Sequence, residues 1–242
     1  MHKPSIYAMI PARYGSTRLK MKNLALINDQ PLISYAIQAS KNSFVFDRVI
    51  VNSENKIFEK IAERYNCDFY LRPNLLGSST AKSDSVVYDF MQSFQEAEIV
   101  AWVNPIAPFQ THDEITEVVN FFLQNNLDSL ITVENKQVHC LYKGTPVNFD
   151  TKSVFAQTQD LEPVQPFVYS VMMWKSEVFI REFEKNGHAL FCGKFDVFPV
   201  RKSTELIVKT KEDLILADQL MRAKERKDST VLSYDEILDR IE

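Results

Sequence analysis

Glycine and cysteine are scarce in this sequence, with 5 and 3 copies in 242 residues. The cysteines Cys67, Cys140 and Cys192 are odd in number and widely spaced, which argues against a disulfide framework or a metal knuckle. We expect buried thiols in a reducing cytosol. The composition also excludes collagen-like and disordered chains, and the scarcity of glycine makes each glycine in a turn informative.

Long hydrophobic runs and an excess of positive charge are missing as well. The first apolar run, residues 5–10, is too short for a signal-peptide core or a membrane span. The formal net charge of −4 argues against a chain that binds polyanions non-specifically, so any phosphate site must be local. Together these absences favour a cytoplasmic protein with no membrane and no nucleic-acid partner.

The remaining composition, 45% hydrophobic and 25% charged residues, suits one globular α/β domain. Short apolar runs predict strands at residues 5–10, 48–51, 68–71, 99–103 and 129–133. Amphipathic stretches predict helices that begin at Pro31 and Thr111, and helices over residues 54–65, 83–94 and 210–224. This alternation predicts a Rossmann-like, mostly parallel sheet with helices on both faces.

Two helix starts carry capping signals. Thr111 and Glu114 form a T-x-x-E capping box, and residues 210–213 cap the helix that runs to about Lys224. Residues 197–209 are expected to be extended, and a last short helix is expected to begin at residues 233–236.

The rhythm changes between residues 135 and 192. This segment is rich in aromatic residues and lacks the alternation of helices and strands. We interpret it as a small lobe inserted into a single domain of residues 1–242. An apolar region outside the regular sheet needs another surface to cover it, which favours a homodimer.

A dense group of cations follows the first predicted strand, in the loop of residues 10–23. The turn Gly15-Ser16-Thr17 supplies N–H groups that can form an anion nest, and Arg and Lys neutralise phosphate. No Gly-Lys-Ser/Thr opens the next helix, so the loop is not a Walker A motif. Composition alone leaves a polyphosphate site and a solvated basic loop equally open. The cations of the loop are Arg13, Arg18, Lys20 and Lys22.

The order of residues in this loop resembles the opening of the sugar-acid cytidylyltransferases. Ile-Pro-Ala-Arg-Tyr-Gly-Ser-Thr-Arg at residues 10–18 is similar to the 3-deoxy-manno-octulosonate enzymes, and Lys22-Asn23 followed by Gln-Pro-Leu-Ile at 30–33 is similar to the acylneuraminate enzymes. The resemblance implies that the loop wraps the triphosphate of CTP. With the weaker matches below, it assigns to the nucleotide Ala12, Arg13, Gly15, Ser16, Arg18, Lys22, Asn23, Ser83 and Asn104.

Weaker matches follow along the chain. Residues 83–87 resemble a nucleotide-facing helix of the family, and Asn104 stands where the acylneuraminate enzymes have glutamine. Residues 159–163, Gln-Asp-Leu-Glu-Pro, resemble the acceptor segment R-Q-D-L-x-P, but Thr158 replaces its arginine. Tyr169-Ser170-Val171 replaces an Asn-Gly-Ala element. The resemblance therefore implies a reshaped acceptor site that includes Gln159 and Tyr169.

The largest departure concerns Mg²⁺. The D-x-D-T metal element of the family should fall at residues 207–210, where both aspartates are absent. Residues 204–210 are expected to form a strand whose alternation places Glu205, Ile207 and Lys209 on one face. Three outcomes stay open: an ion shifted toward Glu205 and held mainly by the triphosphate, Lys209 as a substitute for the ion, or a solvent-facing lysine on a decayed site.

The resemblance implies an enzyme in which a hydroxyl of an acidic sugar attacks the α-phosphorus of CTP and expels pyrophosphate. Arg13, Lys22 and Lys209 are the candidate catalytic residues. The expected product is a CMP-activated acidic sugar for surface polysaccharides. The same resemblance implies pairing through the inserted lobe, which reaches the neighbour's active site.

A rival hypothesis is a non-catalytic nucleotide- or sugar-binding relative that has lost its metal site. The absent aspartates favour this rival, and the intact basic loop disfavours it. The sequence does not identify the acidic acceptor, and it does not distinguish CTP from UTP.

Overall fold

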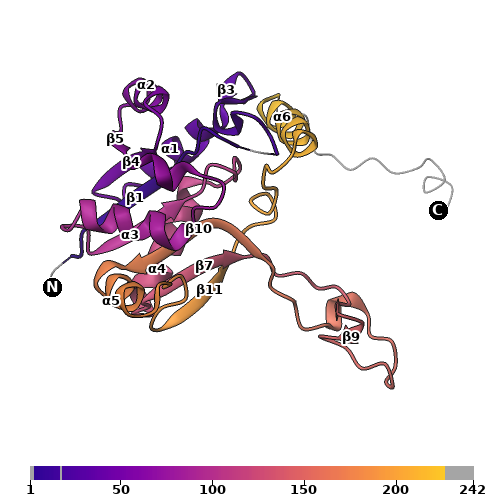
Figure 1. The fold of residues 1–242 in the computed structure, drawn as a ribbon. Coiled ribbons are helices and arrows are strands. Elements are labelled where there is room, and N and C mark those ends of the chain that lie inside the picture. The colour runs from indigo at the N-terminus through magenta and orange to yellow at the C-terminus, as the bar shows by residue number, and fades with distance from the viewer. Residues whose placement is uncertain (1–2, 17, 227–242) are drawn as a thin grey trace.

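The computed structural model describes residues 3–16 and 18–226, and its centre is a seven-stranded sheet (Figure 1). The strand order is β11-β7-β10-β6-β1-β4-β5. Neighbouring strands are parallel except around β10, which is antiparallel to both β6 and β7. The predicted Rossmann-like, mostly parallel sheet is therefore confirmed. The strands are β1 (Ile6–Pro11), β4 (Arg48–Ser53), β5 (Asp68–Leu71), β6 (Ile99–Val103), β7 (Ser129–Val133), β10 (Phe167–Lys175) and β11 (Phe195–Pro199).

Helices cover both faces of the sheet, as predicted. One face carries α1 (Leu32–Ser43), α2 (Ile57–Arg64) and α4 (His112–Gln124), and the other carries α3 (Ser83–Ser93) and α5 (Ser176–Asn186). Strand β1 shows the division residue by residue. Ile6, Ala8 and Ile10 belong to the first core, whereas Tyr7 and Met9 belong to the second.

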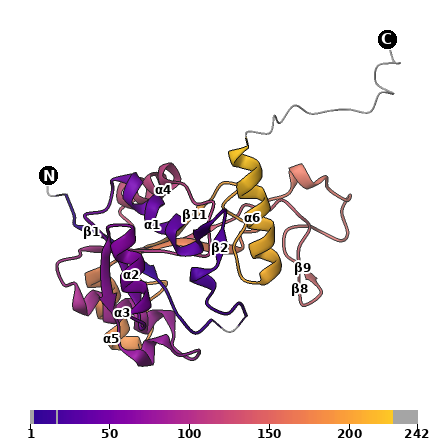
Figure 2. The same cartoon turned by 90° about the horizontal axis from the view of Figure 1, so that it is seen from above.

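A third, smaller core lies beside the sheet and joins α6 (Lys211–Glu225) to a hairpin of β2 (Leu26–Ile27) and β3 (Gln30–Pro31) (Figure 2). Ile27 and Ala217 are buried where these elements meet. The predicted cap of α6 is confirmed, because Thr210 and Asp213 form a complete capping box. Lys209, two residues before this helix, lines a cavity together with residues of the loop after β1.

The predicted lobe is shorter than expected at its C-terminal end. Of residues 135–192, only 135–166 project from the main fold, and they carry β8 (Leu141–Tyr142), β9 (Thr145–Pro146) and a 3-10 turn at Thr158–Asp160 (Figures 1 and 2). Residues 167–192 belong to the main fold, with Trp174 and Phe179 fully buried. The aromatic density of this part therefore serves the core of the domain.

Residues 197–209 were wrongly expected to be extended throughout. Strand β11 ends at Pro199, and residues 202–205 form turns. The carboxylate of buried Glu114 accepts bonds from the Arg201 N–H over 2.5 Å and the Thr204 hydroxyl over 2.7 Å. These bonds turn the backbone away from the sheet, so the predicted strand at residues 204–210 does not exist.

Smaller expectations differ in the same way. Helix α2 begins at Ile57 rather than at residue 54, because the Asn55 side chain accepts the Ile57 N–H over 2.9 Å. Within the described part of the chain, no helix is long and apolar enough to cross a membrane. The helix predicted from residue 233 lies outside the described residues.

Candidate nucleotide site

The first loop lies at the edge of the sheet where the parallel strands β1, β4, β5 and β6 end. Ala12 follows β1, Glu54 follows β4, Arg72 follows β5 and Asn104 follows β6. Ligands of open α/β sheets bind outside this edge. Ala12 is buried, and its N–H donates to the Asn52 carbonyl over 2.8 Å, which fixes the start of the loop to the neighbouring strand.

A cavity of about 260 Å³ opens at this edge, and a smaller one of about 60 Å³ shares Arg13, Ser16 and Lys22 with it. The larger cavity is lined by Pro11, Arg13, Ser16, Lys22, Asn23, Arg72, Leu76, Ser78, Ala81, Ser83, Val86, Trp102, Asn104 and Ile106. The smaller cavity is lined by Arg13, Ser16, Arg18, Leu19, Lys22 and Lys209. Most of the predicted nucleotide residues thus meet around one continuous site.

Arg13 and Asn23 shape the loop from inside. The Arg13 guanidinium donates to the Ser78 carbonyl over 3.1 Å, and the buried Asn23 amide donates to the Arg13 carbonyl over 3.4 Å. Met21 adopts the left-handed conformation with φ 49°, which reverses the chain before Lys22. Gly15 is exposed, and a Cβ on it would meet nothing within 4 Å. Its predicted role on the nucleotide stays a prediction.

Arg72 forms the buried floor of the larger cavity. Its guanidinium pairs with Glu54 over 2.7 Å, and the other Glu54 oxygen accepts the Tyr14 N–H over 2.8 Å. Burial lowers the pKa of Arg72, although the Glu54 charge opposes this effect. Among the described residues, Arg72 Nε and Trp102 Nε1 are buried donors with no hydrogen-bond partner. Two unsatisfied donors beside one cavity point to a ligand with acceptor atoms.

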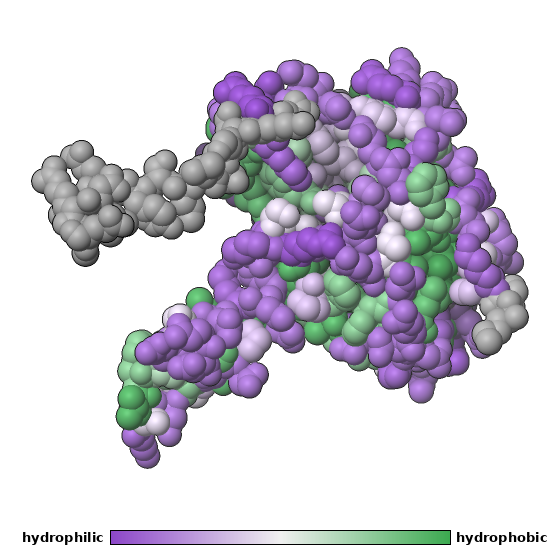
Figure 3. All heavy atoms as spheres, turned by 180° about the vertical axis from the view of Figure 1, so that it is seen from behind, coloured by the Kyte–Doolittle hydropathy of each residue, from purple (hydrophilic) through white to green (hydrophobic). Residues whose placement is uncertain are grey.

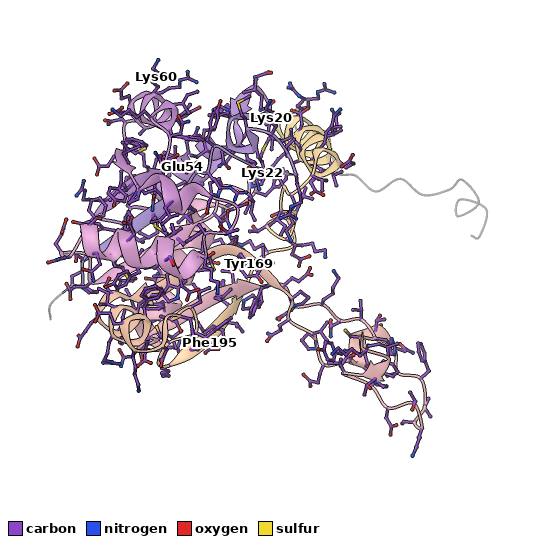
Figure 4. The ribbon with its side chains drawn as sticks, viewed as in Figure 1. Lys20, Lys22, Glu54, Lys60, Tyr169 and Phe195 are labelled. Atoms are coloured by element: carbon purple, nitrogen blue, oxygen red, sulfur yellow. The ribbon has the colours of Figure 1, made fainter. Side chains whose placement is uncertain are left out.

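Lys22 lies near the end of the first loop and faces Tyr169, at the start of β10, across the site (Figure 4). Its ammonium donates to the Val208 carbonyl over 3.3 Å. Burial and the neighbouring cations of the smaller cavity lower the pKa of Lys22 from 10.5 to about 8. The site therefore holds more positive charge than its own acidic residues compensate, which favours a bound anion.

Lys209 reaches the smaller cavity from a backbone fixed at both sides. The Val208 N–H donates to the Ile106 carbonyl over 2.7 Å, and the Lys209 N–H donates to the Asp213 carboxylate over 2.9 Å. Partial burial opposes ionisation of Asp213, but the bonds from the Lys209 and Thr210 backbones hold its pKa below the usual value. Lys209 thus lines the smaller cavity together with residues of the first loop, although no strand presents it.

The two predicted acceptor residues lie apart from the cavities. Gln159 is exposed on the lobe, where its carbonyl accepts the Gln137 amide over 3.1 Å. Tyr169 is 39% exposed at a bulge of β10, with φ 59°. Neither residue lines the two cavities of its own chain. Their substrate role stays a prediction.

The residues present do not fit a protein-held Mg²⁺, which prefers carboxylate, phosphate and water oxygens. Across residues 3–16 and 18–226, no three His, Cys, Asp or Glu side chains come together to hold a metal ion. The described residues that line the two cavities include no acid. The Glu205 carboxylate lies outside both cavities and pairs with Lys202. The shared face predicted for Glu205 and Lys209 is wrong, because no strand alternates there.

Sequence reasoning did not identify the backbone carbonyls of Ser78 and Val208 as the atoms that position Arg13 and Lys22. No side-chain signal could reveal them. Arg72 was visible as the first residue after a predicted strand, but its ion pair with Glu54 depends on the β4–β5 pairing. Trp102, in the predicted strand of residues 99–103, also lines the larger cavity, and sequence reasoning did not identify it as a site residue.

Known proteins match this chain over most of its length. A family model described as cytidylyltransferase matches residues 7–221. N-acylneuraminate cytidylyltransferase of Escherichia coli is 35% identical over 120 residues, which are 50% of this chain and 29% of that protein. Pseudaminic acid cytidylyltransferase of Campylobacter jejuni is 28% identical over 172 residues, which are 63% of this chain and 71% of that protein.

The likeness in fold extends further than the identity. The structure of CMP:2-keto-3-deoxy-manno-octonic acid synthetase complexed with CTP superposes with a TM-score of 0.68 at 14% identity, covering 91% of this chain and 99% of the other. This match supports the fold alone.

The chain spans only 29% and 58% of the length of the N-acylneuraminate cytidylyltransferases of Escherichia coli and Streptococcus agalactiae that it matches.

Proposed function

This chain belongs to the cytidylyltransferase family, and we propose that it transfers CMP from CTP to a hydroxyl group of an acidic sugar. The observation that carries the proposal is the uncompensated group of cations at the carboxyl edge of the sheet. Arg13, Arg18, Lys22 and Lys209 line a cavity of about 60 Å³ that opens next to a larger polar one. The similarity to N-acylneuraminate and pseudaminic acid cytidylyltransferases supports the same reaction class.

The two cavities divide the nucleotide between them in this proposal. The smaller cavity takes the triphosphate, because four cations and Ser16 line it. The larger cavity takes the nucleoside, where Ser83 and Asn104 offer polar groups to the sugar and the base. The unsatisfied donors of Arg72 and Trp102 supply two more contacts to acceptor atoms.

The reaction makes one P–O bond and breaks another. The acceptor oxygen attacks the α-phosphorus, the bond to the β-phosphate oxygen breaks, pyrophosphate leaves and the hydroxyl proton passes to solvent. The protein positions the reactants and stabilises the charge that develops on the transferred and leaving phosphates. We assign these tasks to Arg13, Lys22 and Lys209, three of the four cations that line the small cavity.

We also propose a homodimer that forms through the lobe of residues 135–166. Apolar atoms gather on this lobe (Figure 3), and Val154 and Phe155 are 89% and 80% exposed. Gln159 and Tyr169 lie on and beside the lobe, away from their own cavities, so we assign them to the acceptor site of the neighbouring subunit. Light scattering that shows a 28.0 kDa monomer at micromolar concentration would contradict this assembly.

The cell compartment and the product follow from the same reaction. CTP is a cytosolic substrate, and the free thiols of half-buried Cys67 and buried Cys192, whose pKa values desolvation raises to about 11, suit a reducing cytosol. The product is a CMP-activated acidic sugar for surface polysaccharides. Any Mg²⁺ enters with the triphosphate, because the cavity residues supply no carboxylate for it.

Two substitutions test the nucleotide site. Each charge-assisted contact to phosphate contributes about 1.5–3 kcal/mol, so Arg13→Ala and Lys22→Ala should each weaken CTP binding by at least about tenfold. Lys20→Ala is the matched control, because Lys20 is an exposed cation of the same loop that lines neither cavity (Figure 4). Isothermal titration calorimetry measures all three. Unchanged CTP affinity in both test variants would discard the site.

A further inference from the structure

The carboxylates nearest the proposed phosphate site are already bound to protein groups. The Glu54 oxygens accept bonds from Arg72 and the Tyr14 N–H, over 2.7 and 2.8 Å. One Asp213 oxygen accepts the N–H groups of Lys209 and Thr210, over 2.9 and 2.8 Å. A divalent ion that took these bonded oxygens as ligands would have to break a helix cap or a buried ion pair.

Lys209 places a positive charge at the cavity where a divalent ion would otherwise neutralise phosphate. Lys209 lines the small cavity opposite the loop that carries Arg13 and Arg18. Its backbone is held by the cap of α6 and by the bond from Val208 to the Ile106 carbonyl. The held backbone sets the point from which the flexible Lys209 side chain reaches the cavity. Lys209 is therefore placed as a permanent element of the site.

The local charge balance agrees with this placement. The Lys22 ammonium donates to the carbonyl of Val208, the residue before Lys209, so the two lysines approach the cavity together. Among the described residues, no acid lines the cavity to neutralise them. Four side-chain cations around one cavity match the charge of a triphosphate without a protein-bound metal.

We infer that Lys209 supplies, as a fixed ammonium, the positive charge that would otherwise require a divalent ion held by protein carboxylates. The inference rests on the proposed nucleotidyl transfer and gives Lys209 a specific part in it, the replacement of a protein-held ion. In this arrangement CTP binds in the absence of free Mg²⁺. A magnesium ion, when present, is carried by the triphosphate and water oxygens alone.

Calorimetry with CTP in EDTA and in Mg²⁺ tests the inference without requiring turnover. Wild-type affinity should agree within about threefold between the two conditions. Lys209→Ala should weaken CTP binding in EDTA by at least about tenfold, and Lys209→Arg should restore most of it. Glu205→Ala and Lys211→Ala should change affinity by less than about twofold, because Glu205 pairs with Lys202 and Lys211 is exposed outside both cavities.

A metal titration without nucleotide gives an independent readout. Electron paramagnetic resonance should show that Mn²⁺ stays free in the presence of the protein alone and is bound only when CTP is added. Tight Mn²⁺ binding to the nucleotide-free protein that Glu205→Ala abolishes would overturn the inference. CTP binding that vanishes in EDTA yet survives Lys209→Ala would also overturn it and leave the proposed function intact. Absence of CTP binding under every condition would overturn both.

Discussion

Replacing Lys22 by methionine should make the protein more stable and less able to bind CTP. Burial and neighbouring cations lower the pKa of Lys22 from 10.5 to about 8. At about 1.4 kcal/mol for each tenfold change in proton affinity, the charged form costs about 3 kcal/mol of folding free energy. Losing the hydrogen bond to the Val208 carbonyl destabilises the variant by about 1 kcal/mol, which offsets part of this gain. Lys22→Met should therefore raise the free energy of unfolding by about 2 kcal/mol near neutral pH.

The pH dependence identifies the cause. Below pH 8 the lysine is charged in the folded and unfolded states, so its full penalty is present. Between about pH 8 and 10.5 the folded protein releases this proton while the unfolded chain keeps it, so wild-type stability rises with pH. The advantage of Lys22→Met should accordingly shrink across this interval and disappear above it.

Urea unfolding of both proteins at several pH values between 7 and 10.5 measures this difference. Lys20→Met serves as the control, because Lys20 is exposed in the same loop and should change stability by less than about 0.5 kcal/mol. A Lys22→Met variant that is less stable than wild type at neutral pH would refute the reasoning. A stabilisation that does not change with pH would attribute the effect to packing instead of charge.

Three further outcomes follow from the same contacts. Glu114→Ala should lower the free energy of unfolding by about 3 kcal/mol in urea titrations, because the buried partners of this carboxylate lose their acceptor. Glu114→Gln should retain part of the stability. Phe155→Ser should raise the dissociation constant of the proposed dimer at least about tenfold in analytical ultracentrifugation without changing monomer stability, since Phe155 is 80% exposed. CTP affinity should fall as Lys22 loses its proton above about pH 8, whereas Lys22→Arg should remove this decrease in calorimetry.

The sequence predicted the regular part of the fold because local patterns and global packing agree there. Strand β1 alternates between two cores, and Val118, Val119 and Phe122 of α4 lie on its buried face. The cap at Thr210 predicted the start of α6 to the residue. In each case the residues that determine the element lie within a few positions of one another.

Long-range contacts explain what sequence reasoning missed. Sequence reasoning placed the residues of β10 in an irregular lobe, and the bulge at Tyr169 does interrupt the regular strand. Pairing with β6 and β7 nevertheless buries Trp174 completely. Glu114 looks like half of a capping box, but its side chain instead binds Thr204 across 90 positions of sequence. The Glu114 carboxylate thus binds both the Arg201 N–H and the Thr204 hydroxyl at the turn of residues 202–205.

The candidate site divides in the same way. Arg13, Lys22 and Asn23 were identified from a motif, because one short loop carries them all. Their anchors could not be identified, because the carbonyls of Ser78 and Val208 belong to distant segments whose side chains carry no sign of the contact. The sequence therefore predicts which charges bind phosphate, and only the fold shows how these side chains are held.

The most direct test of the account is the product formed from CTP and an acidic sugar. The purified full chain is incubated with CTP or UTP and a panel of acidic sugars, and pyrophosphate release is measured together with mass spectrometry of the nucleotide product. The account predicts one pyrophosphate for each CMP-sugar formed with at least one acceptor, and at least about tenfold less product in Arg13→Ala. A protein that binds CTP but forms no CMP-linked product with any acidic sugar would contradict the account and favour the non-catalytic relative.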